Sequence, residues 1–404
     1  MRDTVNRVIF SLLCLASFLG ELRSRRRRLF WKKTGRGLPR GGPSSVWFHT
    51  LSVGEVSGAG ALALAVKEQF PHLRVVLTVA TSAGYEAARE RLGGRLEVYP
   101  GPLLCSRVLE RYFQALSPRL FVLVESDLWP NFLYYLRDKG VPLLLVNAAL
   151  SERSRRRLAR LPRLARWLYR PFRVLAAASP EDQARLSSLL PEASVLYLGN
   201  LKYDFPPPRA EEVEGLRQEL SPYLRPPTVV AGSTHPGEEI LLLEAFRLLG
   251  RGTLILCPRH PERAEELLAL ARAAGFSAAR RSRPFPAPVI VVDTLGELRA
   301  LYGLAEVALV GGTLVPVGGH NLLEPAALGV PLVFGPYVES VASVARELVA
   351  SGGGLPAPPE PAALARALEK ALSERQSRGE AARAVYQTHQ GAVERYLRLF
   401  AQFL

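Results

Sequence analysis

The sequence predicts an α/β fold with two domains, each built on a parallel sheet. Short apolar runs alternate with segments of helical length, which is the pattern of buried parallel strands joined by crossover helices. These runs are Arg74 to Thr78, Leu120 to Val124, Leu143 to Val146, Thr228 to Ala231, Thr253 to Cys257, Val289 to Val292, Ala305 to Val310 and Leu332 to Phe334. With 404 residues, 48% of them hydrophobic, the chain is long enough for two sizeable cores.

The expected organisation along the chain follows from composition. Residues 1–43 form a basic amphipathic segment, 44–205 an N-terminal domain, 206–221 a linker that begins with Pro206-Pro207-Pro208, and 222–385 a C-terminal domain. Residues 386–404 are expected to form a C-terminal helix.

The N-terminal segment predicts contact with a membrane surface. Val8 to Gly20 is apolar but spans thirteen residues, fewer than the roughly 20 that cross a bilayer. Its apolar side chains follow helical spacing, and basic residues come directly after, which favours an anionic membrane on the cytoplasmic side. A terminal helix packed on the protein itself is the alternative, and a cleavable signal peptide fits poorly.

The net charge of +15 is concentrated in two patches. Residues 1–43 carry +9 and residues 151–173 carry +8, so the rest of the chain is nearly neutral. Two patches of this kind favour an anionic surface or substrate, although a solvated helix face would also explain the second. Nucleic acid is not the expected partner, because no binding motif accompanies the arginines.

Cysteine and histidine give no metal-binding signal. Cys14, Cys105 and Cys257 lie in apolar surroundings, and none of the six histidines has the spacing of zinc ligands. We expect reduced thiols and no metal site.

The segment from Val310 to Pro325 predicts a loop that binds an anion. An apolar run leads into two glycine pairs, Gly311-Gly312 and Gly318-Gly319, and Glu324-Pro325 can open a helix whose N–H groups face the ligand. A plain strand-turn-helix corner is the alternative. Polar residues also follow the apolar runs that end near Thr50, Val124, Gly232 and Cys257, and the carboxyl ends of parallel strands are where such sheets bind ligands. We therefore expect two Rossmann-like halves facing a cleft, with a nucleotide on the C-terminal half.

Eight motifs in the same order closely resemble one family, the 3-deoxy-D-manno-octulosonic acid (Kdo) transferases of lipopolysaccharide synthesis. The motifs span nearly the whole chain: His49 to Val56, Thr81 to Glu86, Glu125 to Asn131, Leu150 to Ser154, Gly199 to Asp204, Gly232 to Glu239, Pro258 to Arg263, and Gly318 to Pro325. The resemblance implies a GT-B architecture, a peripheral or monotopic position on the cytoplasmic side of the inner membrane, and transfer of Kdo from CMP-Kdo to a phosphorylated, acylated lipid A precursor. It implies neither a cofactor nor a metal ion, and it suggests that residues 386–404 return to the N-terminal domain.

The resemblance also implies three catalytic residues. Glu55, whose position after Gly54 suggests a loop, is expected to be the general base that accepts the proton of the acceptor hydroxyl during one inverting displacement. Glu125 and Lys202 are expected to stabilise the transition state, with Lys202 near the donor's negative charge and Glu125 orienting it or the acceptor. The alternatives are a carboxylate at a helix N-terminus for Glu55 and a structural ion pair for Glu125.

The donor residues are implied in the same way. They are Pro258, Arg259, Gly296, Glu297, Leu298, Asn321, Leu322, Leu323 and Glu324. Arg259 suits phosphate through its planar guanidinium, Asn321 lies at the expected helix entrance, and Glu324 suits ribose hydroxyls.

The sequence departs from the family pattern at two places on the acceptor half. Ala149 stands where an arginine is common, and the aspartate expected around Tyr99 to Pro102 is missing. These departures leave open the acceptor and the number of sugars added. The alternative functions are a related GT-B transferase with another nucleotide sugar or acceptor, and a noncatalytic basic scaffold.

Overall fold

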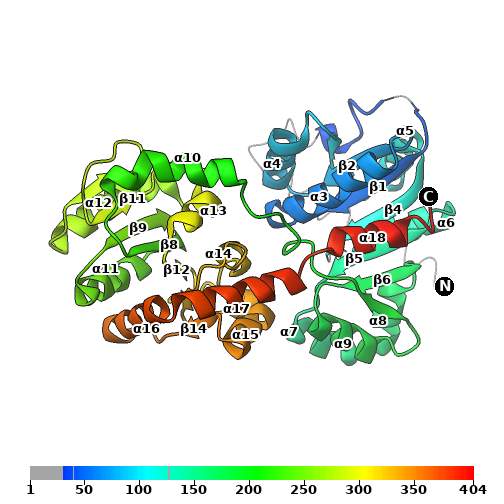
Figure 1. Ribbon diagram of the computed structural model, residues 1–404. Coiled ribbons are helices and arrows are strands. Elements are labelled where there is room, and N and C mark those ends of the chain that lie inside the picture. Colours follow the sequence, from blue (N-terminus) through cyan, green and yellow to red (C-terminus); the bar gives the residue numbers. More distant parts are fainter. Residues whose placement is uncertain (1–30, 40, 126–127) are drawn as a thin grey trace. The chain divides into compact units, whose positions relative to one another are not determined.

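A computed structural model describes residues 31–39, 41–125 and 128–404 and divides the chain into two compact units (Figure 1). Unit 1 comprises the described residues up to Asp204 together with Gly391–Leu404, and unit 2 comprises Phe205–Gln390. The amphipathic segment predicted over Val8 to Gly20 lies outside the described residues. Among the residues that the structure describes, no helix has both the length and the apolar composition needed to cross a bilayer.

Unit 1 is a seven-stranded parallel sheet in the order β3-β2-β1-β4-β5-β6-β7. Its strands are β1 (Ser45–Thr50), β2 (Arg74–Val79), β3 (Glu97–Pro100), β4 (Pro118–Val124), β5 (Leu143–Ala148), β6 (Val174–Ala177) and β7 (Val195–Tyr197). Its helices are α3 (Val53–Gln69), α4 (Ser82–Leu92), α5 (Ser106–Leu116), α6 (Pro130–Asp138), α7 (Glu152–Ala159), α8 (Pro162–Tyr169), α9 (Pro180–Leu189) and α18 (Ala392–Phe400).

Strand residues of unit 1 alternate between two apolar layers. Phe48 and Val122 pack with side chains of α3, α4 and α18, whereas Trp47 and Phe121 pack with those of α5, α6, α8 and α9. Burial of both faces explains why the strands read as continuous apolar runs in the sequence.

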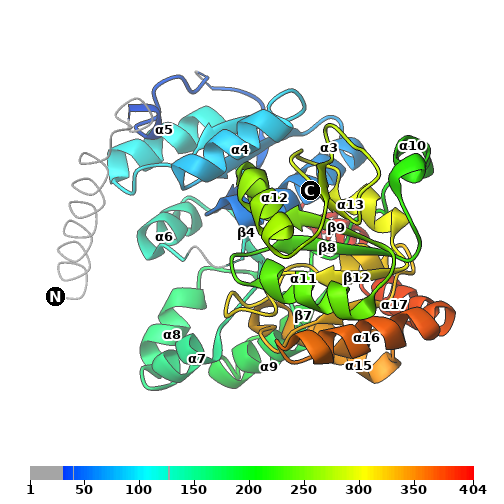
Figure 2. The same ribbon diagram turned by 90° about the vertical axis from the view of Figure 1, so that its left-hand side faces the viewer.

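Unit 2 repeats the plan with the order β10-β11-β9-β8-β12-β13-β14. Its strands are β8 (Thr228–Thr234), β9 (Thr253–Pro258), β10 (Ala278–Arg280), β11 (Val289–Val291), β12 (Val307–Val310), β13 (Leu332–Phe334) and β14 (Gly354–Pro356). The α-helices are α10 (Ala210–Leu220), α11 (Glu238–Leu249), α12 (Ala264–Ala273), α13 (Leu298–Leu301), α14 (Leu323–Ala326), α15 (Ala342–Ser351), α16 (Pro361–Ser373) and α17 (Arg375–Thr388), and Figure 2 shows α11, α12 and α16 from a second side.

The predicted two-sheet α/β class is confirmed, but the linker assignment over 206–221 is wrong for most of its length. Residues 210–220 form α10, and the fully buried Leu220 packs with Val230 and Ile255 of unit 2. The helix was missed because its other side chains are mostly polar, which resembles a solvated connection.

In each sheet the first strand lies in the interior, with the strands that follow it in sequence placed first on one side of it and then on the other. In unit 1 this is β1, which lies between β2 and β4, and in unit 2 it is β8, which lies between β9 and β12. The loops at the carboxyl ends of such neighbours diverge and leave room for ligands. Glu55 follows β1 and Glu125 follows its neighbour β4, while Pro258 ends β9 and Asn321 to Glu324 come after β12, the two neighbours of β8.

Candidate functional site

Glu55 is held at the junction of β1 and α3. Ser52 has extended backbone angles before the helix, and the spacing from Ser52 to Glu55 is that of a capping box. Glu55 is 7% exposed, and its carboxylate accepts hydrogen bonds on Oε2 from Thr50 Oγ1 at 2.5 Å and from Leu51 N at 2.6 Å. Glu55 therefore lies in the first turn of α3, not on a loop as its position after Gly54 suggested.

The second oxygen of Glu55 is less engaged. Among the described residues, Oε1 accepts one hydrogen bond, from Ser52 Oγ at 3.4 Å. A carboxylate oriented through one oxygen keeps the other for a substrate hydroxyl, which is the geometry that a general base needs. The alternative role at the helix N-terminus also applies, because Glu55 is acidic in the first turn.

Glu125 and Lys202 form an ion pair in unit 1. Glu125 follows β4 in a left-handed backbone conformation (φ 71°), and its Oε1 lies 2.7 Å from Lys202 Nζ. The Glu125 side chain is 13% exposed and that of Lys202 is 42% exposed. Burial raises the pKa of Glu125, Lys202 opposes this rise, and the nearby negative charge of Glu55 adds to it. The structure thus brings the three predicted catalytic residues of unit 1 into one electrostatic cluster.

Asn147 belongs to this cluster, and sequence reasoning missed it. It lies near the end of β5 with φ 53°, and its side chain hydrogen-bonds the Glu125 carboxylate. Its Oδ1 accepts from Leu201 N at 3.0 Å, and its backbone N donates to Tyr396 Oη at 3.0 Å. Asn147 therefore ties Glu125 to the Lys202 loop and to α18. The only sequence signal was a polar residue at the end of an apolar strand.

The backbone N–H groups of the predicted anion-binding loop, from Gly312 on, already bind a carboxylate of the protein itself. The buried Glu238 carboxylate accepts from the backbone N of Gly312 at 2.8 Å, Thr313 at 3.1 Å and Leu314 at 2.9 Å, and also from His235 N at 2.8 Å. A Cβ at Gly311 would lie 2.4 Å from Ser233 O, so glycine is required there. These loop amides therefore bind a protein carboxylate instead of the ligand that the glycine pattern predicted.

The helix expected from Glu324 begins one residue earlier and is short. α14 spans four residues, and Asn321 Oδ1 accepts from Leu323 N at 3.1 Å. Leu322 and Leu323 are fully buried. Burial raises the pKa of Glu324, while the charges of Arg299 and Arg259 oppose this rise.

The remaining donor residues lie in two other loops. Pro258 ends β9, and the exposed Arg259 donates its backbone N–H to Thr234 O at 2.9 Å, which holds it beside the end of β8. Arg259 is within electrostatic reach of Glu324. These contacts bring the arginine, the carboxylate and the end of β8 together.

The segment from Gly296 to Leu298 is anchored separately. Gly296 has φ 88°, and Glu297 accepts from Thr294 Oγ1 at 2.7 Å and from Arg281 at 3.2 Å. A Cβ on Gly232 would lie 2.8 Å from Leu298 Cδ1, so Leu298 packs against the end of β8. Within the described residues, no group of three or more His, Cys, Asp or Glu side chains is arranged to hold a metal ion.

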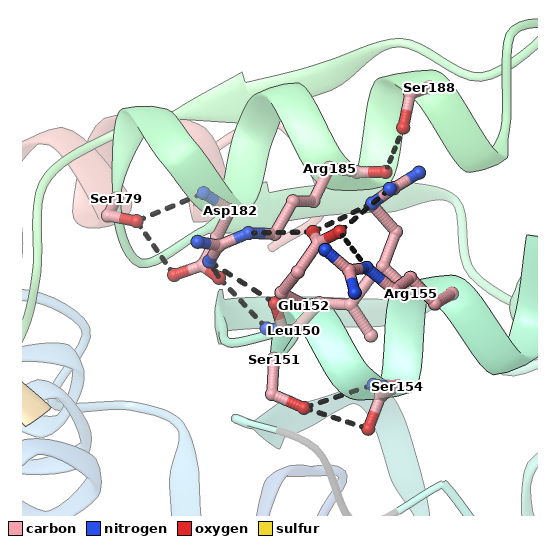
Figure 3. A network of polar contacts seen from close by, with 10 residues as sticks. Leu150, Ser151, Glu152, Ser154, Arg155, Ser179, Asp182, Arg185 and Ser188 are labelled. Atoms are coloured by element: carbon pink, nitrogen blue, oxygen red, sulfur yellow. Dashed lines mark hydrogen bonds and ion pairs between the residues drawn. The ribbon is translucent and has the colours of Figure 1, made fainter. Parts of the chain in front are cut away.

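The motif from Leu150 to Ser154 forms a polar network at the start of α7 (Figure 3). Ser151 Oγ accepts from Ser154 N, and Leu150 N donates to Asp182 Oδ1 at 3.0 Å. Glu152 pairs with Arg155 at 2.8 Å and Arg156 at 2.9 Å, and these hydrogen bonds lower the pKa of Glu152 to about 2. The motif therefore positions α7 relative to α9.

Other arginines of this region remain available to a partner. Arg153, Arg157, Arg160 and Arg163 are exposed and form no ion pair with any residue that the structure describes. Leu161 is 55% exposed and Leu164 is 40% exposed among them. We call these four arginines and two leucines the α7–α8 surface.

Comparisons with known proteins agree on one family. A family model described as 3-Deoxy-D-manno-octulosonic-acid transferase (kdotransferase) matches residues 23–205. A 3-deoxy-D-manno-octulosonic acid transferase of Haemophilus influenzae is 32% identical over 376 residues, covering 90% of this chain and 88% of the relative. One of Bordetella pertussis is 33% identical over 384 residues, covering 90% and 89%.

Solved structures agree on the architecture. HepE of Anabaena in complex with UDP is 17% identical with a TM-score of 0.57, covering 89% of this chain and 99% of that one. MurG of Acinetobacter baumannii is 17% identical with a TM-score of 0.57, covering 89% and 100%. At this identity the likeness shows the fold, which is GT-B with two parallel-sheet α/β domains. With its relatives matched over most of their length, the chain belongs to the 3-deoxy-D-manno-octulosonic acid transferase family of glycosyltransferases.

Proposed function

We propose that the protein moves Kdo from CMP-Kdo to a phosphorylated, acylated lipid A precursor, with inversion and without a metal ion or cofactor. The observation that carries this proposal is the cluster in unit 1, where Glu55 keeps one carboxylate oxygen for a substrate beside the Glu125–Lys202 ion pair. The family's name supplies the transferred sugar, the family resemblance implies the donor and the acceptor, and the groups described below suit both.

On the acceptor side, Glu55 accepts the proton of the attacking hydroxyl. The hydroxyl oxygen forms a bond to the anomeric carbon while the bond from that carbon to the phosphate oxygen breaks, and its electron pair leaves with the nucleotide. Because one displacement occurs, the configuration inverts. The hydrogen bonds from Thr50 and Leu51 keep the carboxylate oriented during this step.

Glu125 and Lys202 supply fixed charge near the reaction. Lys202 is held 2.7 Å from Glu125 but remains 42% exposed, so its ammonium can also face an anionic group of a substrate. A preorganised cation of this kind stabilises negative charge that grows in the transition state. Asn147 and Leu201 keep the Lys202 loop in place.

On the donor side, unit 2 offers groups that suit a nucleoside monophosphate sugar. The exposed Arg259 suits phosphate, and Glu324 suits ribose hydroxyls as an acceptor. Asn321 to Leu323 and Gly296 to Leu298 complete the proposed binding residues.

The α7–α8 surface suits the acceptor and the membrane that holds it. Unpaired arginines attract phosphate groups, and exposed leucines between them suit acyl chains. This arrangement supports a peripheral position on the cytoplasmic side of the inner membrane.

The test is a transfer assay with the full chain, CMP-Kdo generated in situ and a tetra-acylated lipid A precursor, with product mass as the readout. We expect the mass of the acceptor to increase by one or more Kdo units. Competition by CMP but not by UDP is expected, and competition by UDP with no Kdo transfer would favour the related transferase that uses another nucleotide sugar.

A further inference from the structure

Two histidines of unit 2 share a hydrogen bond at the end of β8. His235 follows β8, His320 follows the loop after β12, and their Nε2 atoms lie 2.8 Å apart. The ring centroids are 5.0 Å apart and the planes differ by 7°. That centroid separation is close to the Nε2–Nε2 distance plus one ring radius on each side. The rings therefore meet edge to edge in one plane, through an N–H···N hydrogen bond.

This geometry determines how protons are distributed in the neutral pair. One Nε2 donates and the other accepts, so one Nδ1 must carry a proton and the other must not. In the part of the chain that the structure describes, neither Nδ1 has a hydrogen-bonding partner. One added proton would convert both Nδ1 atoms into donors, because the pair would then share the central proton as a cation.

The surroundings disfavour an added proton on His320 in the absence of a ligand. Burial lowers the pKa of His320 to about 4, with further contributions from His235 and the positive charge of Arg259. The carboxylate of Glu238, at the start of α11, is directed at four backbone N–H groups. Glu239 pairs with Arg263, and Glu324 on α14 lies near Arg259 and Arg299.

An anion beside Arg259 would reverse this balance. It would neutralise the positive charge that opposes protonation, and it would accept hydrogen bonds from the protonated Nδ1 atoms. His235, His320 and Arg259 follow strands β8, β12 and β9, and in the sheet β8 lies between β9 and β12. This is the same end of the sheet that the proposed donor site occupies.

We propose that His235 and His320 form a proton-linked phosphate-binding site, which takes up one proton when the nucleotide's phosphate monoester binds beside Arg259. The inference rests on the proposed function, because it names how that donor site holds the leaving nucleotide. Neither histidine is among the donor residues that family resemblance implied.

The proton uptake would favour bond cleavage. In the donor the phosphate is a diester with one negative charge. When the bond from the sugar carbon to the phosphate oxygen breaks, the electron pair remains on that oxygen and the released monoester carries two charges. A site that gains a proton as this second charge develops binds the product phosphate, and the transition state before it, more tightly than the diester.

The test is titration calorimetry of CMP into the full chain, in buffers of different ionisation enthalpy. The measurements run between about pH 7.5 and 9, above the second pKa of a phosphate monoester at about 6, so that the ligand contributes no proton. We expect net uptake of up to one proton per CMP and a Kd that rises with pH, by at most about tenfold per pH unit. Cytidine, which lacks the phosphate, is expected to bind without proton uptake.

Three variants locate the proton. His320→Gln and His235→Gln are expected to remain folded, to bind CMP more weakly and to lose the proton uptake. His260→Gln is the matched control, because His260 follows Arg259 but its side chain is 61% exposed beside Glu262. Proton uptake by this variant on binding CMP should equal that of the wild type.

The outcomes separate this inference from the proposed function. CMP binding by the wild type with no proton uptake and a Kd independent of pH overturns the inference and leaves the CMP donor in place. Proton uptake that persists in both histidine variants also overturns it. Absence of CMP binding to the folded protein overturns both.

Discussion

Glu125 shows how burial and charge compete at a single residue. Its side chain is mostly buried, so its pKa is raised, yet the 2.7 Å contact with Lys202 favours the charged form. A folded-state pKa above the unfolded one means that stability falls as pH rises from the unfolded value toward the folded one. The charge of Lys202 opposes the rise in the pKa of Glu125 and so reduces this loss of stability.

Replacing Lys202 by methionine is therefore expected to destabilise unit 1 in a pH-dependent way. The pKa of Glu125 should rise further, so the deficit relative to wild type is small near pH 4.5 and grows to about 1 kcal/mol near pH 8, a modest value because Lys202 is 42% exposed. Denaturant unfolding across this pH range measures it. Lys139→Met, which breaks the exposed 3.0 Å pair with Glu110, is the control, and an equal deficit at all pH values in Lys202→Met would contradict the explanation.

At the level of single residues, the family motifs named three members of the cluster in unit 1, and their catalytic roles stay predictions. Glu55, Glu125 and Lys202 were named from the family pattern, and the structure brings them together. Placing Glu55 on a loop overlooked the Ser52-to-Glu55 spacing, which is a helix-start signal in its own right. Asn147 could not be singled out, because its role depends on contacts with Leu201 and Tyr396, which are 54 and 249 residues away.

At the scale of elements, the loop after β12 depends on the first turn of α11. The Glu238 side chain is fully buried and orders Gly312, Thr313 and Leu314 through their backbone N–H groups. The same carboxylate accepts from His235 N, so it also fixes the end of β8.

Glu238→Gln is expected to destabilise unit 2 by about 3 kcal/mol, because a neutral amide replaces a buried carboxylate that accepts four hydrogen bonds and its NH2 group faces other donors. CMP affinity should fall as the loop loses its order. Glu244→Gln, at an exposed position of the same helix, should change neither property. Unfolding and CMP titration measure both variants, and wild-type stability of Glu238→Gln would show that the carboxylate does not hold the loop.

The sequence predicted this strand, its glycine pairs and the helix after them, because each has a local signal. It did not predict the partner of the loop amides. Glycine-rich loops present N–H groups to any anion, and the one found here comes from a residue 74 positions earlier in the chain. The pairing of loop and carboxylate is set by the sheet order, which local patterns do not specify.

At the scale of the whole molecule, the last residues of the chain complete the core of unit 1. Tyr396 and Phe400 of α18 are fully buried with side chains of α3, and Asp204 accepts from Gly391 N at 2.9 Å at the start of the helix. The two-domain prediction did not depend on this return, because the apolar runs alone indicated two sheets.

Deleting Gly391–Leu404 is expected to destabilise unit 1 by more than about 5 kcal/mol, since two buried aromatic side chains are lost. Unit 2 should keep its CMP binding. Hydrogen exchange resolved by segment, combined with CMP titration, measures both effects, with Glu394→Ala on the exposed face of α18 as the control. Unchanged protection of β1 and β4 in the truncated chain would contradict the role given to α18.

The α7–α8 surface carries a prediction about membrane binding by the full chain. Leu161→Asp should lower the affinity for vesicles that contain anionic lipid about tenfold, because an apolar contact is lost and a negative charge is added among arginines. Val349→Asp, a similarly exposed position of unit 2 at 44%, is the control. Equal vesicle binding of Leu161→Asp and wild type in a sedimentation assay would remove this surface from the proposed membrane contact.

The central claim is that Glu55 is the base of a Kdo transfer, and its most direct test is the mass-resolved transfer assay on wild type and Glu55→Gln. The account predicts transfer by the wild type and a loss of about 10²- to 10⁴-fold in the variant. CMP binding should be unchanged, and Glu90→Gln, at an exposed position of α4, should keep the full rate. A folded Glu55→Gln protein that transfers Kdo at the wild-type rate would contradict the account.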